Sequence, residues 1–384
     1  MTGARTVLLG DVCKFVGGGT PSRAQPEYFQ GDIPWATVKD FKTFLISDTE
    51  EHISEVAIAG SATNIISPGT VLLVTRVGLG KVAIAGCRLA INQDVKAITP
   101  TDDVLPEFLF WFLLSKANDI QRMGAGATVK GVTLNDIKSI TMPVPTIPEQ
   151  RHIVDILSRA DGIVRLRREA EKKAAELIPA LFLDMFGDPA TNPKGWPTCS
   201  IAELCTVQTG GTPSRENPAY YEGEIPWVKT GEVVGSVILN TEEHISAQAL
   251  AETNCKKFPV GTILVAMYGQ GQTRGRCAVL GIEASTNQAC AAILPSDRIA
   301  GEFLFRHLQI QYEHLRSLAQ GGNQANLNLS MIKNYTVILP PKAIQNKFVE
   351  RVSEVSSIQS QQSAATEMAQ ATFDALLSQV FTHT

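Results

Sequence analysis

Hydrophobic and polar positions divide the chain into two kinds of segment, and each kind occurs twice. In the first kind, short apolar runs such as GTVLLV and KVAIAG are separated by turns rich in glycine and proline. Apolar runs of this length, bounded by turn residues, predict buried or half-buried strands. We therefore expect two β-rich α/β (α+β) globules.

The second kind of segment has a helical pattern. From Pro148 to about Phe186, apolar or small residues recur at spacings of three and four, which predicts a long helix with a heptad seam. The predicted seam comprises Ile153, Ile156, Ala160, Ile163, Arg167, Ala170, Ala174, Leu177 and Leu181. A weaker stripe near the C-terminus comprises Phe348, Val352, Val355, Ile358, Gln362, Ala365, Ala369, Thr372 and Leu376. Pro179 lies inside the first helix and is expected to kink it.

The two halves of the chain repeat the same motifs in the same order. GGTPSR occurs at Gly18 and again at Gly210, followed in each copy by G[DE]IPW and TEEHIS. The offset is 192 residues up to Gly80 and 195 afterwards, because the second copy has a longer central loop. NQ pairs, EFLF and a glutamine that follows a proline-rich stretch then match in register. One unit of about 195 residues has been used twice, which is too long for a solenoid repeat.

This duplication predicts an architecture. We place globules at residues 1–147 and 187–342, and helical spacers at 148–186 and 343–384. A helix of about 35 residues is on the order of 50 Å long. If the second helix buries its stripe against the first, it must run back along it, so the pair is an antiparallel coiled coil with pseudo-twofold symmetry. In that register Arg167 is expected to face Gln362, its equivalent in the repeat.

Composition narrows the class of protein. The chain has 384 residues, of which 44 % are hydrophobic and 19 % charged, as in ordinary globular domains. It contains no run of eighteen apolar residues and no signal-peptide pattern at its start, so we expect a cytoplasmic protein with no membrane association. Seven cysteines without a CxxC pair indicate reduced thiols rather than disulfides or a zinc site.

The sequence motifs of catalysis are missing. There is no phosphate-binding G-x-x-x-x-G-K-[ST] loop and no strand-linked G-x-G-x-x-G cofactor loop. NPAY at Asn217 approaches the N-P-P-Y stretch with which amino-methyltransferases hold a flipped adenine, but it lacks the second proline. His52 and His244 repeat within EEHIS without a partner motif, and His307 and His314 lack a third ligand. We expect no catalytic residue, no cofactor and no metal.

The motifs resemble, in their order and their duplication, the specificity subunit of type I restriction-modification systems. They are GGTPSR, G[DE]IPW, the PGT and VGT before the central strand at Pro68 and Val260, the NQ pairs, and PEQRHIV at the start of the helix. The resemblance extends over essentially the whole chain. It implies two target-recognition domains alternating with two helices, a two-part double-stranded DNA site, docked methyltransferase (modification) subunits, two in number, and restriction or translocase subunits bound through them.

The residues themselves fit a protein that recognises two DNA half-sites. Two rigid globules on a spacer can read half-sites at a set separation, on the order of one DNA turn of about 34 Å. What the copies share is then scaffold, and what differs is the readout of each half-site in the major groove. GGTP is expected to form a structural turn, because glycine and proline favour turns. Trp35 and Trp227 are expected to be buried anchors of the fold.

Candidate DNA contacts lie in three places. The GGTPSR turns offer Ser22, Arg23, Ser214 and Arg215 for phosphates. The central loops offer residues that suit base edges or phosphates, namely Arg76, Lys81, Tyr268, Gln270, Gln272, Thr273, Arg274 and Arg276. The loops after EFLF offer Thr128, Lys130, Asn323, Gln324 and Asn326. The alternative to DNA contact, for each loop residue, is an ordinary solvent-exposed position without a binding role.

Net charge does not favour DNA binding by the chain alone. The formal net charge is -4, and acidic residues slightly outnumber basic ones in each globule. Phosphate neutralisation dominates DNA affinity, so partner subunits would have to supply positive charge. Two alternatives therefore stay open: a tandem coiled-coil scaffold that binds proteins, and a stand-alone bipartite DNA-binding regulator.

Overall fold

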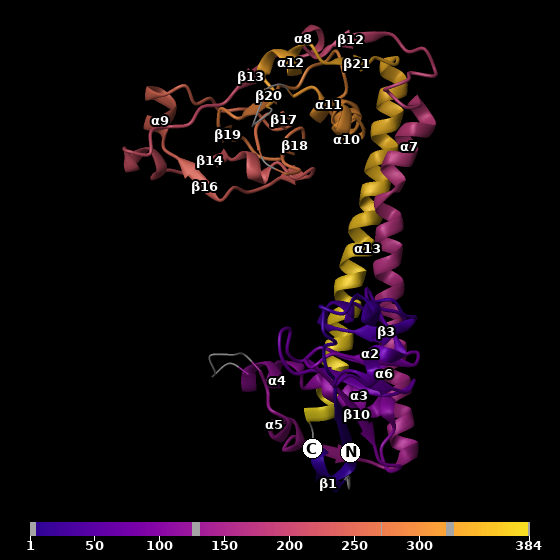
Figure 1. Cartoon of the computed structure of the whole chain (residues 1–384). Helices are drawn as coiled ribbons and strands as arrows, with labels where there is room; N and C mark the ends of the chain where they lie inside the picture. Colours follow the sequence, from indigo (N-terminus) through magenta and orange to yellow (C-terminus); the bar gives the residue numbers. More distant parts are fainter. Residues whose placement is uncertain (1–4, 125–130, 270, 320–325, 383–384) are drawn as a thin grey trace. The chain divides into compact units, whose positions relative to one another are not determined.

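The structure is a computed structural model that describes residues 5–124, 131–269, 271–319 and 326–382. It divides into two compact units (Figure 1). Unit 1 comprises Met1–Glu169 and Ala364–Thr384, and unit 2 comprises Ala170–Ser363. Each unit therefore combines one globule with parts of two long helices that are distant in sequence.

The globule of unit 1 is built on a five-stranded sheet, as the apolar runs predict. The strand order is β2 (Cys13–Gly17), β10 (Val95–Pro100), β7 (Val71–Val74), β8 (Val82–Ala85) and β4 (Leu45–Ile46). Neighbours are antiparallel except β4 and β8, which are parallel. The GTVLLV run forms the central strand β7, and all four of its residues are buried because both faces of the sheet are covered there.

Smaller elements complete this globule. A four-stranded sheet has the order β5 (His52–Ile53), β3 (Ile33–Ala36), β9 (Leu89–Ile91) and β6 (Asn64–Ile66), and β1 (Arg5–Leu8) pairs with β11 (Thr141–Val144). The helices are α1 (Leu9–Val12), α2 (Glu55–Ala59), α3 (Pro106–Ser115), α4 (Ala117–Met123) and α5 (Leu134–Lys138), with 3-10 turns η1 (Pro26–Phe29) and η2 (Val38–Asp40).

Unit 2 repeats this plan, with a three-stranded sheet in place of the four-stranded one. Its five-stranded sheet has the order β13 (Val207–Thr209), β20 (Cys290–Ile293), β17 (Ile263–Ala266), β18 (Cys277–Leu280) and β15 (Val237–Ile238). Its smaller sheets are β16 (Glu243–Ile245), β14 (Ile225–Val228) and β19 (Ser285–Thr286), and β12 (Thr198–Ser200) with β21 (Thr336–Ile338). The helices are α8 (Ile201–Leu204), α9 (Ala247–Glu252), α10 (Gly301–Ile310), α11 (Tyr312–Ser317) and α12 (Leu329–Lys333), with turns η4 (Pro218–Tyr221) and η5 (Thr230–Glu232). The predicted duplication is confirmed.

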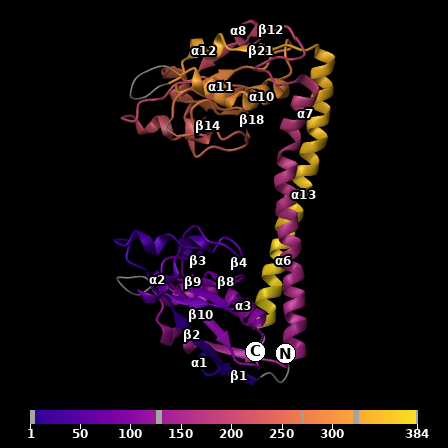
Figure 2. The same cartoon turned by 45° about the vertical axis from the view of Figure 1, so that its right-hand side comes forward.

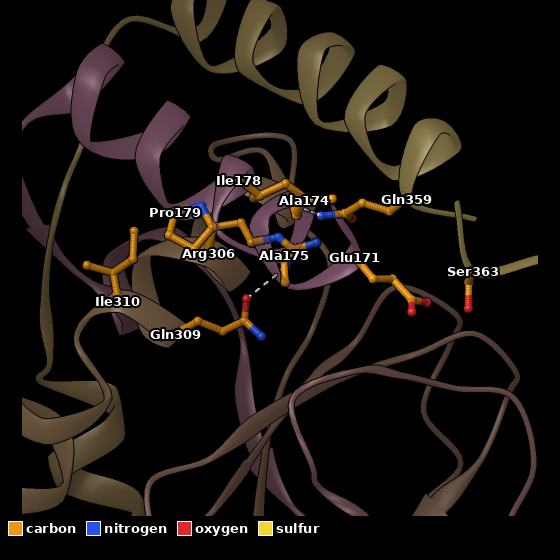
Figure 3. A pocket seen from close by; sticks show the side chains of 10 residues that line it. All are labelled: Glu171, Ala174, Ala175, Ile178, Pro179, Arg306, Gln309, Ile310, Gln359 and Ser363. Atoms are coloured by element: carbon orange, nitrogen blue, oxygen red, sulfur yellow. Dashed lines mark hydrogen bonds between the residues drawn. The ribbon is translucent and has the colours of Figure 1, made fainter. Parts of the chain in front are cut away.

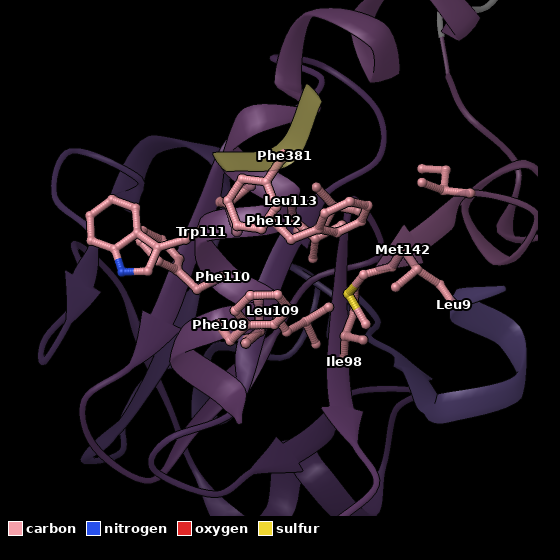
Figure 4. Packing of buried hydrophobic residues seen from close by; sticks show 14 of the residues in the cluster. Leu9, Ile98, Phe108, Leu109, Phe110, Trp111, Phe112, Leu113, Met142 and Phe381 are labelled. Carbon is pink, nitrogen blue, oxygen red and sulfur yellow. The ribbon is translucent and has the colours of Figure 1, made fainter. Parts of the chain in front are cut away.

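The main core of unit 1 lies between the five-stranded sheet, α3 and the end of the C-terminal helix (Figure 4). All residues of α3 from Phe108 to Leu113 are buried, so this helix is apolar on every side. Phe381 places its ring 5.5 Å from that of Phe108 and 5.6 Å from that of Phe112. The C-terminal helix is thereby part of the first globule's core.

Three helices form the spacer segments: α6 (Ile147–Ala175), α7 (Leu177–Phe186) and α13 (Lys342–Thr382). The predicted kink at Pro179 is confirmed, because the helix breaks at Glu176 between α6 and α7. Proline at 179 has no N–H to donate to the carbonyl of Ala175, and its ring would clash with that carbonyl in a straight helix.

In each unit the helix segments run antiparallel. In unit 2, Phe186 contacts Phe348 and Ala174 contacts Gln359, so numbers rise along one helix as they fall along the other. In unit 1 the end of α13 lies beside the start of α6, as both views show (Figures 1 and 2). The predicted antiparallel arrangement therefore holds inside both units.

The predicted seam is only partly correct. Ile153, Ala174, Phe348 and Val352 are buried as expected. Predicted members that are exposed instead are Ile163 (52 %), Leu177 (47 %) and Ile358 (50 %). Their places in the core are taken by Leu157, Val164, Ile178, Phe373 and Leu377. The helices carry more than one apolar stripe, and the globule packed against them decides which stripe is covered.

Hydrogen bonds join the two helix segments inside each unit. Arg168 donates a 2.8 Å hydrogen bond to Gln370 in unit 1, and Gln359 donates one of 2.6 Å to the carbonyl of Ala174 in unit 2. Arg167 belongs to unit 1 and Gln362 to unit 2, so the pairing of these two residues stays a prediction.

Candidate nucleic-acid interface

The repeated motifs meet around one glycine carbonyl in each unit. In unit 1 the carbonyl of Gly19 accepts hydrogen bonds from the indole Nε1 of Trp35 (3.2 Å) and from Oγ1 of Thr63 (2.7 Å). In unit 2 the carbonyl of Gly211 accepts the equivalent bonds from Trp227 (3.0 Å) and from the thiol of Cys255 (3.2 Å). Both tryptophans are buried. GGTP and IPW are thus two parts of one scaffold, and the predicted anchoring role of the tryptophans is confirmed.

The first glycine of each turn is required by close backbone contact. A Cβ on Gly18 would lie 2.0 Å from the carbonyl oxygen of Ile91, and one on Gly210 would lie 1.8 Å from that of Thr286. No side chain fits at such distances. The next residues, Thr20 and Thr212, hydrogen-bond the glutamine of the NQ pair, Gln93 and Gln288 respectively. These contacts explain why GGT and NQ recur together.

The arginine of GGTPSR is held in the same way in both units. Arg23 lies over the Phe29 ring, 4.2 Å from its centroid, and pairs with Glu51 at 2.6 Å. Arg215 lies over the Tyr221 ring at 4.0 Å and pairs with Glu243 at 2.7 Å. Each carboxylate belongs to the repeated TEEHIS motif. The arginines link the 3-10 turns η1 and η4 to the TEEHIS segment of the same globule, and their charge is already compensated by a carboxylate.

A buried glutamine joins each globule to its spacer helix. Gln150 accepts a hydrogen bond from the amide of Leu105 and donates to the carbonyls of Asp103 and Pro145, with distances of 2.8, 2.8 and 2.9 Å. Gln345 accepts from Ala300 and donates to Pro340, both at 2.8 Å. The start of the long helix is therefore fixed to the start of α3 or α10 in the same unit.

The structure brings the NQ turn and the two predicted loops of each unit together. The carbonyl of Thr75, which precedes the central loop, accepts from the amide of Val132, just after the second loop. The carbonyl of Met267 accepts from Leu327 in the same way. The amides of Thr75 and Met267 in turn bond the turn that follows the NQ pair. The GGTP turn, the start of the central loop and the residues that follow the second loop thus lie together in each globule.

The unit 1 edge carries a cluster of positive charge. Arg76 lies 3.8 Å from Asp94 and is half exposed. Lys96 donates to the carbonyl of Gln93 at 3.0 Å, and burial, then the positive charge of Arg76, lower its pKa. Lys96 was not predicted from the sequence because it lies in strand β10. There, the alternation of apolar and polar residues indicates only that its side chain faces solvent. Lys81, at the end of the central loop, is exposed.

The longer central loop of unit 2 is cross-linked by polar side chains. Arg276 donates to Gln272 Oε1 at 2.6 Å, and the hydroxyl of Tyr312 donates to the Gln272 carbonyl at 2.7 Å. Arg316 then donates to that hydroxyl at 2.9 Å. Positive φ angles at Gly269, Gly271 and Gly275 allow the loop its path. Tyr312 and Arg316 of α11 were missed because a helix pattern gives no sign of the loop above it.

The other predicted residues are placed as follows. Tyr268 is exposed, Thr273 and Arg274 are half-buried, and Ser22 and Ser214 are exposed at the turns. Asn326 is half-buried and forms an isolated bridge at the end of the second loop. Thr128, Lys130, Gln270, Asn323 and Gln324 lie outside the described residues.

The histidines and cysteines have ordinary surroundings. His52 pairs with Asp48 at 2.9 Å, and His314 contacts the hydroxyl of Tyr335 at 3.1 Å. His307 is buried beside Phe182 and Phe303, and burial lowers its pKa to about 4. All seven cysteines are free thiols, as expected. Within the described ranges no cluster of three metal-ligating side chains occurs, and no helix is long and apolar enough to cross a membrane.

Comparison with known proteins gives consistent matches. The family profile described as "Type I restriction modification DNA specificity domain" matches residues 1–176 and 193–367. The type I restriction enzyme MjaIX specificity subunit of Methanocaldococcus jannaschii is 27 % identical, over 88 % of this chain and 84 % of its own. The EcoR124I/EcoR124II specificity subunit of Escherichia coli is 33 % identical over 44 % of each chain.

Solved structures share the fold over nearly the full length. A chain from a study of complex assembly and conformational transition of the type I R-M system has a TM-score of 0.68 and 20 % identity, covering 98 % of this chain and 97 % of its own. The S subunit of M. genitalium has a TM-score of 0.58 and 14 % identity, covering 99 % and 97 %. The chain, with two copies of the domain and the matching fold, belongs to the family of non-catalytic DNA specificity subunits of type I restriction-modification systems.

Proposed function

We propose that each globule reads one half of a bipartite, asymmetric DNA site in the major groove, and that the helices set the spacing and dock methyltransferase subunits. In this scheme residues 1–147 and 187–342 are the two target-recognition domains, and 148–186 and 343–384 are the spacers. Two methyltransferase subunits bind the chain, and restriction or translocase subunits bind through them. The chain of similar fold that comes from a study of complex assembly of the type I R-M system supports an arrangement of this kind.

The observation that carries the proposal is the contrast between shared scaffold and differing loops. The glycine turn, tryptophan, arginine pair and helix-clamping glutamine are the same in both units. The loops that emerge beside them differ: Arg76 and Lys81 stand where unit 2 has Tyr268 and Arg276. Arginine and glutamine pair bidentately with guanine and adenine edges. Unequal loops on equal scaffolds suit two unequal half-sites.

The GGTPSR arginines fit a structural role better than the phosphate binding that their charge indicates. A DNA phosphate would have to displace Glu51 from Arg23, or Glu243 from Arg215, to gain a charge-assisted bond. We therefore assign base and phosphate contacts chiefly to the loops. Ser22 and Ser214, at the exposed edge of the turns, stay candidates for phosphate contact.

The exposed apolar residues of the helices support docking of protein partners. They are Ile163, Leu166, Leu177, Leu183, Ile358 and Met368, and each is at least 43 % exposed. Exposed apolar patches are typical of surfaces that another protein covers. Partners docked there would also bring the positive charge that a chain of formal charge -4 lacks.

A gel-shift experiment tests this proposal. The full chain alone is expected to bind genomic DNA fragments weakly, and the chain co-purified with a methyltransferase subunit of its own system should bind a subset tightly. Tight selective binding by the chain alone would favour a stand-alone regulator. Binding of the subunit without any gain in DNA selectivity would favour a protein scaffold.

A further inference from the structure

Unit 2 has a hollow of about 710 Å³ where the break between α6 and α7 meets α10 and α13 (Figure 3). Ala175, Ile178 and Pro179 form one wall, Arg306 and Gln309 another, and Gln359 closes it from α13. A hollow of this size is within the range of ligand and anchor-residue pockets.

Three of the polar side chains around the hollow, Arg306, Gln309 and Gln359, already have partners, and Glu171 and Ser363 also line it. Arg306 donates to Glu302 at 2.7 Å and to Gln309 at 2.9 Å, and Gln359 donates to the carbonyl of Ala174 at 2.6 Å. What the hollow offers is therefore mainly apolar surface. Ala175, which lines the hollow, has a carbonyl that receives no N–H from Pro179.

The equivalent place in unit 1 shows which side chains fit such a space. In the repeat, Arg306 is equivalent to Trp111 of unit 1, and Ile178 is equivalent to Phe373. Trp111 is only 4 % exposed, and its ring lies 5.7 Å from Phe373, 4.8 Å from Phe110 and 5.8 Å from Phe44. Unit 1 thus fills the position with two aromatic rings of its own, whereas unit 2 has neither ring.

We propose that the hollow in unit 2 receives an aromatic side chain, tryptophan or tyrosine, from a helix of the methyltransferase subunit. The inference rests on the proposed docking role of the spacer helices and adds that the two docking positions are unequal. An aromatic ring with one donor matches the apolar walls and the Ala175 carbonyl. Leu177 and Leu183, exposed on the same helix α7, extend the contact surface beside the hollow.

Filling the hollow tests the proposal. Arg306→Trp copies unit 1 and should occupy the space, so that one methyltransferase subunit binds the full chain at least tenfold more weakly while the other binds as before. Arg351→Trp, on the exposed face of α13 in the same unit, is the matched control and should leave both affinities unchanged. Calorimetric titration, with native mass spectrometry for the count of bound subunits, provides the measurement.

A second variant guards against misfolding. Ala175→Phe fills the hollow from the opposite wall without disturbing the Arg306–Glu302 pair, and it should produce the same selective weakening. A photoreactive phenylalanine at position 363, on the rim formed by α13, should cross-link the purified subunit at or next to an aromatic residue. Cross-links confined to segments without an aromatic residue would overturn the proposal.

The remaining outcomes are distinct. If both filled variants bind both subunits as the wild type does, or weaken both bindings equally, the hollow has no docking role of this kind, although the proposed function stands. If the wild-type chain binds no methyltransferase subunit, the proposed function fails and this inference with it. If the chain alone forms a dimer that Arg306→Trp dissociates, the occupant is a second copy and the assignment is wrong.

Discussion

At the scale of single residues, the two units differ most clearly where a polar side chain replaces a ring. His307 of α10 is the equivalent of Phe112 in α3, and it is packed against Phe182 and Phe303. Its Nε2 accepts a 3.3 Å hydrogen bond from the amide of Ile338, and its Nδ1 has no partner among the described residues. The side chain is therefore held neutral in an apolar core.

This arrangement predicts acid sensitivity of unit 2. The pKa of His307 is about 4 when folded and about 6.5 when unfolded. Above pH 6.5 both states are neutral, so stability does not change. As pH falls from 6.5 towards 4 the unfolded state gains a proton first, and stability falls by up to about 3 kcal/mol.

His307→Phe, which copies unit 1, should remove this slope. Denaturant unfolding at a series of pH values between 7 and 4 measures it, and His314→Phe is the control because that histidine is exposed. An unchanged slope in His307→Phe would assign the acid sensitivity to another group. The variant also leaves the Ile338 amide without its acceptor, so a constant destabilisation of about 1–3 kcal/mol at all pH values is expected beside the change in slope.

At the scale of elements, one proline separates two otherwise equivalent helices. Pro179 breaks the helix at Glu176, whereas its equivalent in the repeat, Asp374, lies in the uninterrupted α13 and accepts a hydrogen bond from Gln370. The break lies beside the hollow of unit 2. A straight helix at this point would restore the bond to the Ala175 carbonyl.

We therefore expect opposite effects from two substitutions. Asp374→Pro should destabilise the protein by about 3 kcal/mol, because it removes a helix bond and introduces a clash. Pro179→Ala should stabilise it by less than that, and the amide of residue 179 should become protected from hydrogen exchange. A destabilised Pro179→Ala variant would mean that the bend is needed for the packing of Phe182 and Phe186.

At the scale of the whole molecule, specificity should be separable into two halves. Each unit holds its own turn, loops and clamped helix start, so we expect a change in one unit's loop to leave the other unit's scaffold unaltered. Equal scaffolds then allow one loop to change without altering the fold.

The loops provide the test. Gln272→Ala with Arg276→Ala should reduce discrimination in one half of the site by about 1–3 kcal/mol for each bidentate pairing with a base that is removed. Arg76→Ala should affect only the other half. Competition gel shifts of the complex, with single-base changes placed in each half-site, measure both effects. Relaxation of both halves by either variant would contradict the assignment of one unit to one half-site.

The sequence by itself determined the features that depend on local chemistry and on repetition. Glycine and proline in GGTP, tryptophans after proline, apolar runs and a long 3-4 spacing predict turns, anchors, strands and helices. Motifs repeated in the same order, at offsets of 192 and then 195 residues, predict two equal units. Pro179 predicted the kink because its missing N–H acts within one turn of helix. Each of these signals is local, or is a comparison of the chain with itself.

Tertiary structure decided what depends on which surfaces meet. The helices carry more than one apolar stripe, so the burial of Val164 and Ile178 instead of Ile163 and Leu177 was settled by the globules packed against them. The partners of Arg23 and Arg215, the approach of Lys96 to Arg76, and the position of Tyr312 beneath the central loop depend on contacts between distant segments. The hollow in unit 2 lies where Arg306 and Ile178 replace the facing rings of Trp111 and Phe373, and no spacing along the chain shows that these two positions meet.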